Sequence, residues 1–364
     1  MKGKERVRVA MRRGKPDHVP FIPQICVPHA VLSLGLEFEK TLLDVVRNPL
    51  RMNQLSFQCV KHYGVNGLRA WMPPAPLDVV QVDGIWRGRD PKTGGILDRV
   101  DFCGGGGVLP SEEPTLHTMA DIDAIPVPTA DEVMRGGKLD GIKDIIREAG
   151  EDYFVISCPG AFTPEYLTFV RGKERAMMDL MDQPEFCHYA QEKALKVAIQ
   201  NALALAQIGI DGFMIADTYG GVVGPEGFKV FFLPYFQRFV REMHERLGSK
   251  CPVIYMHVCG NSTRLFELMA DTGVDCIEPL DALGGVQVHD AKRRVGHRVA
   301  LMGGVNTVKL AHGTLDEVVA DTRRCLEEGA VGGGYILAAS DMLPTETSRE
   351  KMQAMIELAG KCKY

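Results

Sequence analysis

The sequence predicts an α/β fold in which parallel β-strands alternate with helices. From residue 153 onward, short apolar runs of strand length are separated by longer amphipathic segments, the pattern of buried parallel strands joined by helical connections. The chain has 364 residues, 45% of them hydrophobic, so it can bury a large core. The alternation is typical of both an open doubly wound sheet and a closed barrel, and periodicity does not distinguish them.

The elements of the second half follow one another regularly. The strands are predicted at residues 153–157, 212–216, 252–258, 274–278, 298–302 and 334–338. The helices are predicted at residues 177–208, 225–247, 262–271 and 315–328. Asn261 and Thr314 carry the side chains expected at helix starts.

The first half is less regular, with a glycine run at residues 104–107 that indicates a loop and an expected hairpin insertion near 79–100. No linker or low-complexity tract divides the chain. We therefore predict a single domain over residues 1–364.

Composition excludes several classes of protein. The formal net charge is -5, and basic residues are interspersed with acidic ones, which argues against a nucleic-acid partner. No apolar run approaches the roughly 20 residues that span a bilayer, and the charged start lacks the apolar stretch of a secretory signal, so we expect a cytoplasmic protein and no membrane partner. The 10 cysteines include no CxxC pair, unlike a disulfide framework.

The polar residues at the carboxyl ends of the predicted strands are the candidates for chemistry, because both candidate folds place their sites there. His257 and Cys259 end one strand, and side chains two apart in a strand point to the same side. Imidazole and thiolate suit zinc, which needs a third protein ligand in a catalytic site. Asp341, Glu278 or Cys158 is the predicted third ligand. The alternative is a buried, hydrogen-bonded histidine beside a structural cysteine.

Other strand-end residues have open roles. Asp217 is a candidate general acid or base, as are His257 and Glu278, but Asp217 could equally be a helix or turn cap and Glu278 could pair with a cation. We expect Tyr219, Asn261 and Asp341 to contact substrate. The chain lacks HExxH, GxSxG, protein-kinase and Rossmann signatures, so zincin, serine hydrolase, phosphotransferase and dinucleotide oxidoreductase activities have no support.

With these residues in view, the chain resembles the uroporphyrinogen decarboxylase superfamily. The segments that carry the resemblance are residues 217–221, 224–235, 256–261, 303–305 and 343–344, and, near the start, residues 15–20. Their order and spacing match over the second half and less specifically before it. The resemblance implies a single (β/α)8 TIM barrel, which favours the closed form of the fold.

The superfamily includes tetrapyrrole decarboxylases and corrinoid-linked methyltransferases, and the sequence is more similar to the second group. Decarboxylases carry arginines near the start for substrate carboxylates, whereas residues 21–30 here read FIPQICVPHA. Methyltransferases of this branch carry His-x-Cys at a zinc site, matched here by His257 and Cys259. Relatives that methylate thiols add a second cysteine, where this chain has Ser340. An oxygen ligand in its place makes zinc a harder Lewis acid, which favours donors with oxygen leaving groups.

The resemblance thus implies a cobalamin-dependent O-demethylase methyltransferase that moves a methyl group from a methoxylated aromatic compound to cob(I)alamin. No histidine follows an aspartate by two residues, as in the Asp-x-His-x-x-Gly motif of cobalamin carriers, so the cofactor is expected on a partner corrinoid protein. Methyl transfer from a corrinoid to a thiol or to tetrahydrofolate, decarboxylation of a smaller substrate, and a non-enzymatic corrinoid or metal chaperone are the alternatives. A second copy of the chain, forming a homodimer, is a further candidate partner.

Overall fold

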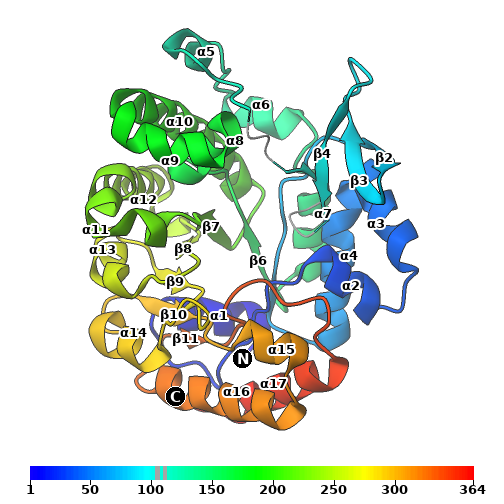
Figure 1. Ribbon diagram of the computed structural model, residues 1–364. Coiled ribbons are helices and arrows are strands. Elements are labelled where there is room, and N and C mark those ends of the chain that lie inside the picture. The colour runs from blue at the N-terminus through cyan, green and yellow to red at the C-terminus, as the bar shows by residue number, and fades with distance from the viewer. Residues whose placement is uncertain (103–106, 110–112) are drawn as a thin grey trace.

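A curled parallel β-sheet forms the centre of the protein. The computed structural model describes residues 1–102, 107–109 and 113–364 (Figure 1). Within them, the sheet has seven strands in the order β1-β6-β7-β8-β9-β10-β11, and every neighbouring pair is parallel. The strands are β1 (Gly67–Arg69), β6 (Phe154–Ser157), β7 (Gly212–Ala216), β8 (Val253–His257), β9 (Cys276–Glu278), β10 (Ala300–Met302) and β11 (Tyr335–Ile336).

The predicted α/β fold with a parallel sheet is confirmed, but the sheet has seven strands rather than the eight of the predicted closed barrel. Residues 20–22 connect with both of its edges. Beside β11, Leu337 pairs with Phe21 in an isolated parallel bridge, and the Ile22 N–H donates to the Leu337 carbonyl at 3.1 Å. On the other side, the Asn66 N–H donates to the Phe21 carbonyl at 3.0 Å. A single bridged segment therefore occupies the place where an eighth strand is expected.

Helices cover the outside of the sheet, except that α1 packs against its inner face (Figure 1). Those of the first part are α1 (Gly3–Met11), α2 (Val27–Ser33), α3 (Phe38–Arg47), α4 (Leu50–Tyr63), α5 (Met119–Asp123), α6 (Ala130–Arg135) and α7 (Asp140–Ala149). They are followed by α8 (Pro164–Arg171), α9 (Lys173–Asp182), α10 (Pro184–Gln207), α11 (Gly220–Phe231), α12 (Leu233–Leu247), η1 (Gly248–Lys250), η2 (Thr263–Leu265) and α13 (Phe266–Asp271). The last ones are α14 (Val288–Val295), α15 (Thr307–His312), α16 (Leu315–Ala330) and α17 (Arg349–Lys361).

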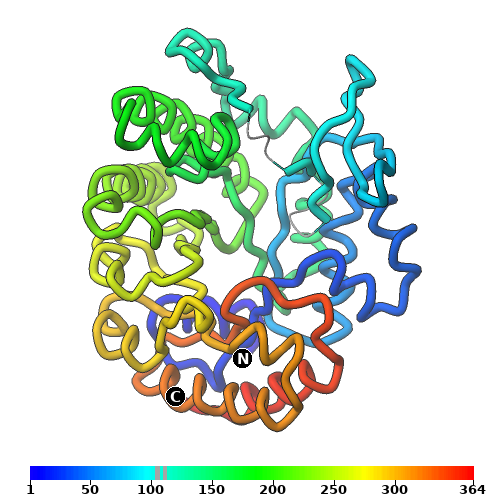
Figure 2. The backbone as a smooth tube through the Cα atoms, in the orientation of Figure 1, coloured from blue at the N-terminus to red at the C-terminus, as the bar shows by residue number. Residues whose placement is uncertain are grey.

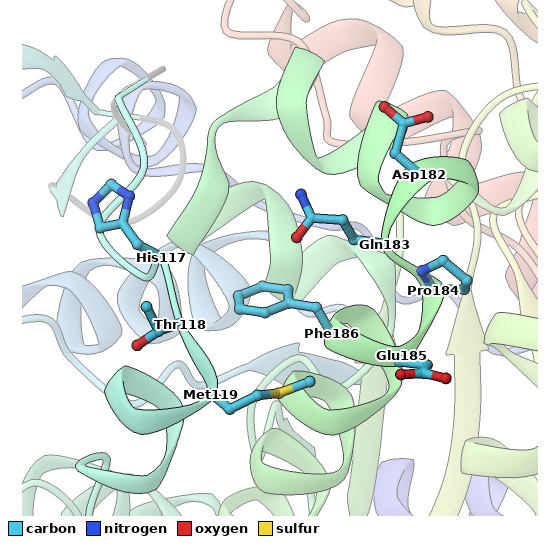
Figure 3. Close-up of a pocket in the computed structure, with 8 residues that line it drawn as sticks. All are labelled: His117, Thr118, Met119, Asp182, Gln183, Pro184, Glu185 and Phe186. Atoms are coloured by element: carbon cyan, nitrogen blue, oxygen red, sulfur yellow. The ribbon is translucent and has the colours of Figure 1, made fainter.

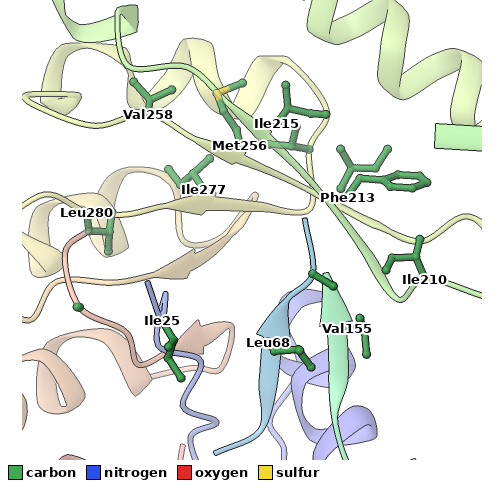
Figure 4. Close-up of a cluster of buried hydrophobic side chains, with 14 of the residues drawn as sticks. Ile25, Leu68, Val155, Ile210, Phe213, Ile215, Met256, Val258, Ile277 and Leu280 are labelled. Carbon is green, nitrogen blue, oxygen red and sulfur yellow. The ribbon is translucent and has the colours of Figure 1, made fainter. Parts of the chain in front are cut away.

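Alternate residues of the strands pack into two separate apolar clusters, as the two-residue period of a strand requires. The outward-facing side chains pack with the helices and include Leu68, Val155, Phe213, Ile215, Met256 and Ile277 (Figure 4). The inward-facing set includes Ile156, Met214, Tyr255, Cys276 and Ile336, together with Val7 and Met11 of α1. Helix α1 thus packs against the inner face of the sheet.

The two ends of the chain meet beside the sheet. The tube in Figure 2 brings its blue start and red end together at the bottom of the view. The Val19 N–H donates to the Cys362 carbonyl at 3.0 Å, and the Tyr364 hydroxyl donates to the Tyr335 carbonyl at 2.5 Å. The N-terminal segment is therefore held against β11 and α17.

Two of the predicted helices are each divided into two. The predicted helix at 177–208 is interrupted at Gln183, where α9 ends and Pro184 begins α10. The predicted helix at 225–247 corresponds to the end of α11 and the whole of α12. These two helices are separated at Phe232, and Pro234 lies in the first turn of α12. Proline has no N–H to continue a helix but suits a first turn. The predicted helix start at Thr314 is confirmed, because Thr314 is the N-cap of α16 and forms a reciprocal capping box with Glu317. The predicted start at Asn261 is one residue early, because the N-cap of η2 is Ser262.

An antiparallel sheet occupies the region of the predicted hairpin. It consists of β2 (Asp78–Val82), β3 (Ile85–Arg89), β4 (Ile96–Asp101) and β5 (Gly107–Val108) in sequential order. In Figure 1, β2, β3 and β4 lie away from the parallel sheet, beside α3. Except for Gly107, the predicted glycine loop lies outside the described residues. No helix in the described ranges combines the length and apolarity that crossing a membrane would need.

A glycine after β10 provides a test of how tightly the strand ends pack. Gly303 has φ +111°, and a Cβ there would lie 1.6 Å from the Pro279 carbonyl oxygen. Gly303→Ala is expected to lower the free energy of unfolding by about 2 kcal/mol or more, because the backbone must move and adopt a strained φ. Urea unfolding followed by circular dichroism measures the change.

Gly360→Ala is the matched control for this substitution. Gly360 lies in α17, and a Cβ there meets no atom within 4 Å. Alanine is expected to raise the free energy of unfolding by up to about 1 kcal/mol, through helix propensity. Equal effects of the two substitutions would contradict the close packing at Gly303.

Candidate metal site at the strand ends

His257 and Glu278 meet because they occupy paired positions at the ends of neighbouring strands. They are Cα partners in the β8–β9 register and continue the inward-facing rows that contain Tyr255 and Cys276. The His257 Nδ1 forms a short hydrogen bond with Glu278 Oε2. Glu278 is 2% and His257 5% exposed, so the pair is almost fully removed from solvent.

Cys259 and Asp341 complete a cluster around the other nitrogen of this histidine. His257 Nε2 lies 3.0 Å from Cys259 Sγ and 3.8 Å from Asp341 Oδ1. The Cys259 thiol donates to Asp341 Oδ2 at 3.7 Å. One ligand atom from each of these three residues lies within 4.8 Å of the others. The two-residue spacing of His257 and Cys259 therefore places both side chains on one side, with the carboxylate of Asp341 beside them.

A glycine turns the chain away after Cys259. Gly260 has φ +74°, a left-handed conformation that glycine adopts at little cost. Its N–H donates to Asp281 Oδ2 at 2.9 Å, while Asp281 Oδ1 accepts from the N–H of Leu283 at 2.8 Å. Asp281 thereby joins the loops that follow β8 and β9 and fixes the path of the chain beside the cluster.

Burial and charge act against each other within the cluster. Burial alone would lower the pKa of His257, but the adjacent Glu278 carboxylate and Cys259 raise that pKa well above its usual value. Burial alone would raise the pKa of Glu278, yet the nearby Arg69 and His257 lower it. Burial raises the pKa of the Cys259 thiol, with His257 opposing the shift. These shifts together favour the charged forms of His257 and Glu278 and oppose ionisation of the Cys259 thiol.

The donor set of the cluster fits a zinc ion. Nitrogen, sulfur and oxygen donors are each common zinc ligands, and a catalytic site uses three protein ligands with one position open. Glu278 does not complete this set, because its oxygens bind His257 Nδ1 and Arg69. A carboxylate on the distal nitrogen is the usual partner of a metal-binding histidine, since it fixes the tautomer and the ring orientation. Among the predicted third ligands, the geometry therefore favours Asp341.

The remaining predicted site residues lie in different surroundings. Cys158 is outside the cluster, and burial raises the pKa of its thiol. Tyr219 precedes α11 and lines a cavity at the same end of the sheet. Asn261 is exposed, and its Oδ1 accepts from the Thr263 N–H at 3.1 Å, a contact within its own loop. Contacts of these residues with a substrate remain predictions.

Both carboxylate oxygens of Asp217 accept hydrogen bonds from other groups of the protein. Its Oδ2 accepts from the Thr163 hydroxyl and from the Glu165 N–H at 2.9 Å, at the start of α8. Its Oδ1 accepts from the Tyr219 N–H at 2.6 Å. Of the two predicted roles, these contacts favour a cap. Burial, reinforced by the nearby Glu165 carboxylate, raises the pKa of Asp217 to about 7.

A cavity of about 530 Å³ lies at the same end of the sheet. Its apolar lining includes Trp71, Phe169 and Met342, and Met342 directly follows Asp341 of the cluster. Among the described residues of its lining, Asp101, Glu165 and Lys173 are charged, and the remaining polar ones include Gln24, Thr218 and Tyr219. Its volume is in the range of small-molecule sites.

A second cavity of about 490 Å³ lies among the outer helices (Figure 3). Figure 3 shows His117 and Met119 on one side, and Asp182 and Phe186 on the other. These residues come from the start of α5 and from the junction of α9 with α10. None of them follows a strand of the parallel sheet, so this cavity is separate from the candidate metal site.

Sequence reasoning missed Arg69, whose Nη2 donates to Glu278 Oε1. It ends β1, a strand of only three residues that is too short to produce a periodic apolar signal. The neighbouring Trp71, which lines the cavity, was missed for the same reason. The run from Val65 to Trp71 is apolar except for Asn66 and Arg69, and that interruption was the available signal.

Comparison with known proteins relates the chain to one family. A family model described as uroporphyrinogen decarboxylase (URO-D) matches residues 98–362. The uroporphyrinogen decarboxylase of Thioalkalivibrio sulfidiphilus is 30% identical over 183 residues, which cover 50% of each chain. That of Alcanivorax borkumensis is 27% identical over 268 residues, covering 69% of this chain and 72% of the relative. The match thus spans half of the first relative and about seven tenths of the second.

A solved structure has a similar fold over the whole chain. A methyltransferase from Methanosarcina mazei superimposes with a TM-score of 0.72 and 20% sequence identity. The match covers 99% of this chain and 98% of that one. At this level of identity the comparison establishes the similarity of the folds.

The cluster leads to a prediction about zinc. Purified protein is expected to bind zinc, and Cys259→Ala to bind it at least tenfold more weakly, because one of three donors is lost. In the presence of chelator, the melting temperatures of the wild type and of Cys259→Ala are expected to differ by only a few degrees, because a zinc site of the catalytic type does not hold such a fold together. Zinc content by mass spectrometry and thermal unfolding measure these effects. Cys362→Ala, near the C-terminus, is the control, and equal zinc content in all three proteins would contradict the prediction.

The raised pKa of Asp217 predicts a pH-dependent effect on stability. This pKa is about 7 in the folded protein against an ordinary value of 3.8, so between these pH values the folded state binds the proton that the unfolded state has released. The contribution of Asp217 to stability therefore falls as pH rises from about 4 to about 7. The amide introduced by Asp217→Asn does not titrate, so the free energy of unfolding of the wild type should fall relative to the variant over this range. Urea unfolding at several pH values measures the difference, and a difference that rises with pH would contradict the assignment.

Proposed function

Because the chain belongs to the uroporphyrinogen decarboxylase family, we propose that it works within this fold as a methyltransferase rather than as a decarboxylase of a tetrapyrrole. The proposed reaction moves a methyl group from a methoxylated aromatic compound to cob(I)alamin held by a partner corrinoid protein. The difficult part of such a transfer is the departing phenolate, whose developing negative charge must be neutralised.

The observation that carries the proposal is the cluster of His257, Cys259 and Asp341 at the strand ends. These three residues would hold zinc, which supplies Lewis acidity toward the departing oxygen when it is bound. Glu278 binds the distal nitrogen of His257 and directs Nε2 toward Cys259. In this proposal Glu278 therefore acts by positioning the imidazole, and Asp341 provides the oxygen donor.

The neighbouring cavity supports an aromatic substrate. Trp71 and Phe169 provide flat apolar surfaces, and Met342 lies in the lining immediately after Asp341. Aromatic rings pack favourably on such side chains, and apolar walls exclude water from the reacting atoms. A ring bound in this cavity would have its methoxy group near the cluster.

The charges of the cavity are unfavourable for a substrate with many carboxylates. Lys173 is the only cationic residue among its described lining, whereas Asp101 and Glu165 are acidic. The stretch at residues 21–30 contributes Gln24 to the lining and has no arginine. Since buried carboxylates require paired charges or hydrogen-bond donors, this lining argues against the substrate of the relatives named uroporphyrinogen decarboxylase.

The donor set also bears on the alternative of a thiol acceptor. Ser340 stands where the thiol-methylating relatives are expected to have a cysteine, and it is fully buried with its Oγ lacking a hydrogen-bond partner among the described residues. The oxygen of Asp341 replaces the softer sulfur of a second thiolate, which favours a harder, more electrophilic site. This donor set therefore favours an ether as the methyl donor over a thiol as the methyl acceptor.

Anaerobic methyl transfer to free cob(I)alamin tests the function. Zinc-loaded protein is expected to consume cob(I)alamin with a 2-methoxyphenol, at a rate well above that of methyl transfer from methylcobalamin to coenzyme M or homocysteine. The absorbance of the corrinoid measures both directions. Cys259→Ala should lose this activity by at least 10²-fold, while Cys362→Ala should retain it.

Two results would contradict the proposal. A clear preference for the thiols would indicate that the protein instead transfers the methyl group from a corrinoid to a thiol. Release of carbon dioxide from uroporphyrinogen without any methyl transfer would instead assign the activity of the named relatives.

A further inference from the structure

A line of three charged side chains crosses the inside of the sheet. Arg69 Nη2 donates to Glu278 Oε1, and Glu278 Oε2 binds His257 Nδ1. The side chains of Arg69, Glu278 and His257 are 3%, 0% and 7% exposed. The guanidinium of Arg69 thus binds the same carboxylate that binds the imidazole of His257, a candidate metal ligand.

Glu278 is the principal polar partner of this arginine. The Nε and Nη1 atoms of Arg69 are buried without a hydrogen-bond partner among the described residues, and the guanidinium lies 5.8 Å from the centre of the Tyr255 ring. Burying N–H groups without acceptors is costly, and a buried ion pair often adds no net stability. A contribution to stability alone therefore does not explain why Arg69 is buried at this position.

The contact does constrain the orientation of the carboxylate. One oxygen of Glu278 is held by Arg69 from β1, and the other faces His257 on the neighbouring β8. With both oxygens bound to partners from different strands, rotation of the carboxylate breaks one contact or both. The imidazole orientation depends on this carboxylate because His257 Nδ1 is bound to it.

We propose that Arg69 is a positioning residue for the metal site, which acts through Glu278 to direct His257 Nε2 toward Cys259 and Asp341. The inference rests on the proposed function in one respect, that the cluster binds zinc. Outer partners of a metal-binding histidine typically change metal affinity by about 10- to 100-fold, and we expect an effect of this size from the loss of Arg69.

A second buried arginine provides the matched control. Arg171 Nε donates to Asp179 Oδ2 at 2.7 Å, and the two side chains are 6% and 1% exposed. Like Arg69, it lies over an aromatic ring, at 4.9 Å from the centre of Phe186. It belongs to α8, and its Nη1 donates to the Leu116 carbonyl at 2.6 Å rather than to a residue of the cluster. Arg171→Met should lower the free energy of unfolding without changing the metal site.

Zinc affinity separates a positioning role from a structural one. Competition with a chromophoric chelator is expected to show Arg69→Met binding zinc about 10- to 100-fold more weakly than the wild type, with wild-type affinity for Arg171→Met. The visible spectrum of bound Co²⁺ should change in Arg69→Met alone. Arg69→Lys, which retains a cation, should fold if the methionine variant does not, and should show an intermediate affinity.

Equal zinc affinity of wild type and a folded Arg69 variant would overturn the inference, as would equal weakening by Arg171→Met. If the wild type binds no zinc, the metal part of the proposed function fails, and the inference is decided by ¹⁵N NMR of the histidines. The His257 signals, assigned with His257→Gln, should then report a hydrogen-bonded Nδ1 proton in the wild type and its loss in the Arg69 variants. An unchanged Nδ1 signal in those variants would overturn the positioning role independently of any metal.

Discussion

The contact between Arg69 and Glu278 requires the whole sheet to curl. Three strands, β6, β7 and β8, separate β1 from β9 in the sheet order. Neighbouring strands lie about 4.8 Å apart, so in a flat sheet the two residues would be about 19 Å apart, more than an arginine side chain can span. Curling brings the inner faces of β1 and β9 toward each other, and the candidate metal site therefore depends on the curvature as much as on its own residues.

Burial of these charges is tolerated because they are paired with one another, while apolar side chains occupy the other layers of the sheet. Two residues before His257 and Glu278 along their strands, the inner face is occupied by Tyr255 and Cys276, and further down by α1. These layers exclude water and make the electrostatic contacts above them stronger. The same exclusion makes an unpaired charge expensive, so Arg69, Glu278 and His257 are each stable there only while the others are present.

Local patterns in the sequence were sufficient for much of the fold and for part of the site. Buried strands such as Gly212–Ala216 are apolar throughout, and the spacing of His257 and Cys259 requires only the two-residue period of a strand. The interruption of an apolar run marks Arg69, but its role could not be found in this way, because its partner lies 209 residues later in the chain and its strand has only three residues. The choice of Asp341 over Glu278 as the third donor likewise depends on which carboxylate the distant arginine occupies, which no local pattern contains.

The relation between this fold and its chemistry therefore lies in a few side chains at the strand ends. A shared fold permits several reactions, so family membership alone does not decide between the activity of the named relatives and the proposed methyl transfer. A substrate with many carboxylates needs cations around it, but Lys173 is the one cationic residue of the described cavity lining, and the buried cation Arg69 is bound to Glu278. Since the guanidinium of Arg69 is bound to the carboxylate of Glu278, its positive charge is balanced within the protein. The methoxylated aromatic donor of the proposed reaction, which needs no cation to bind, is compatible with this distribution of charge.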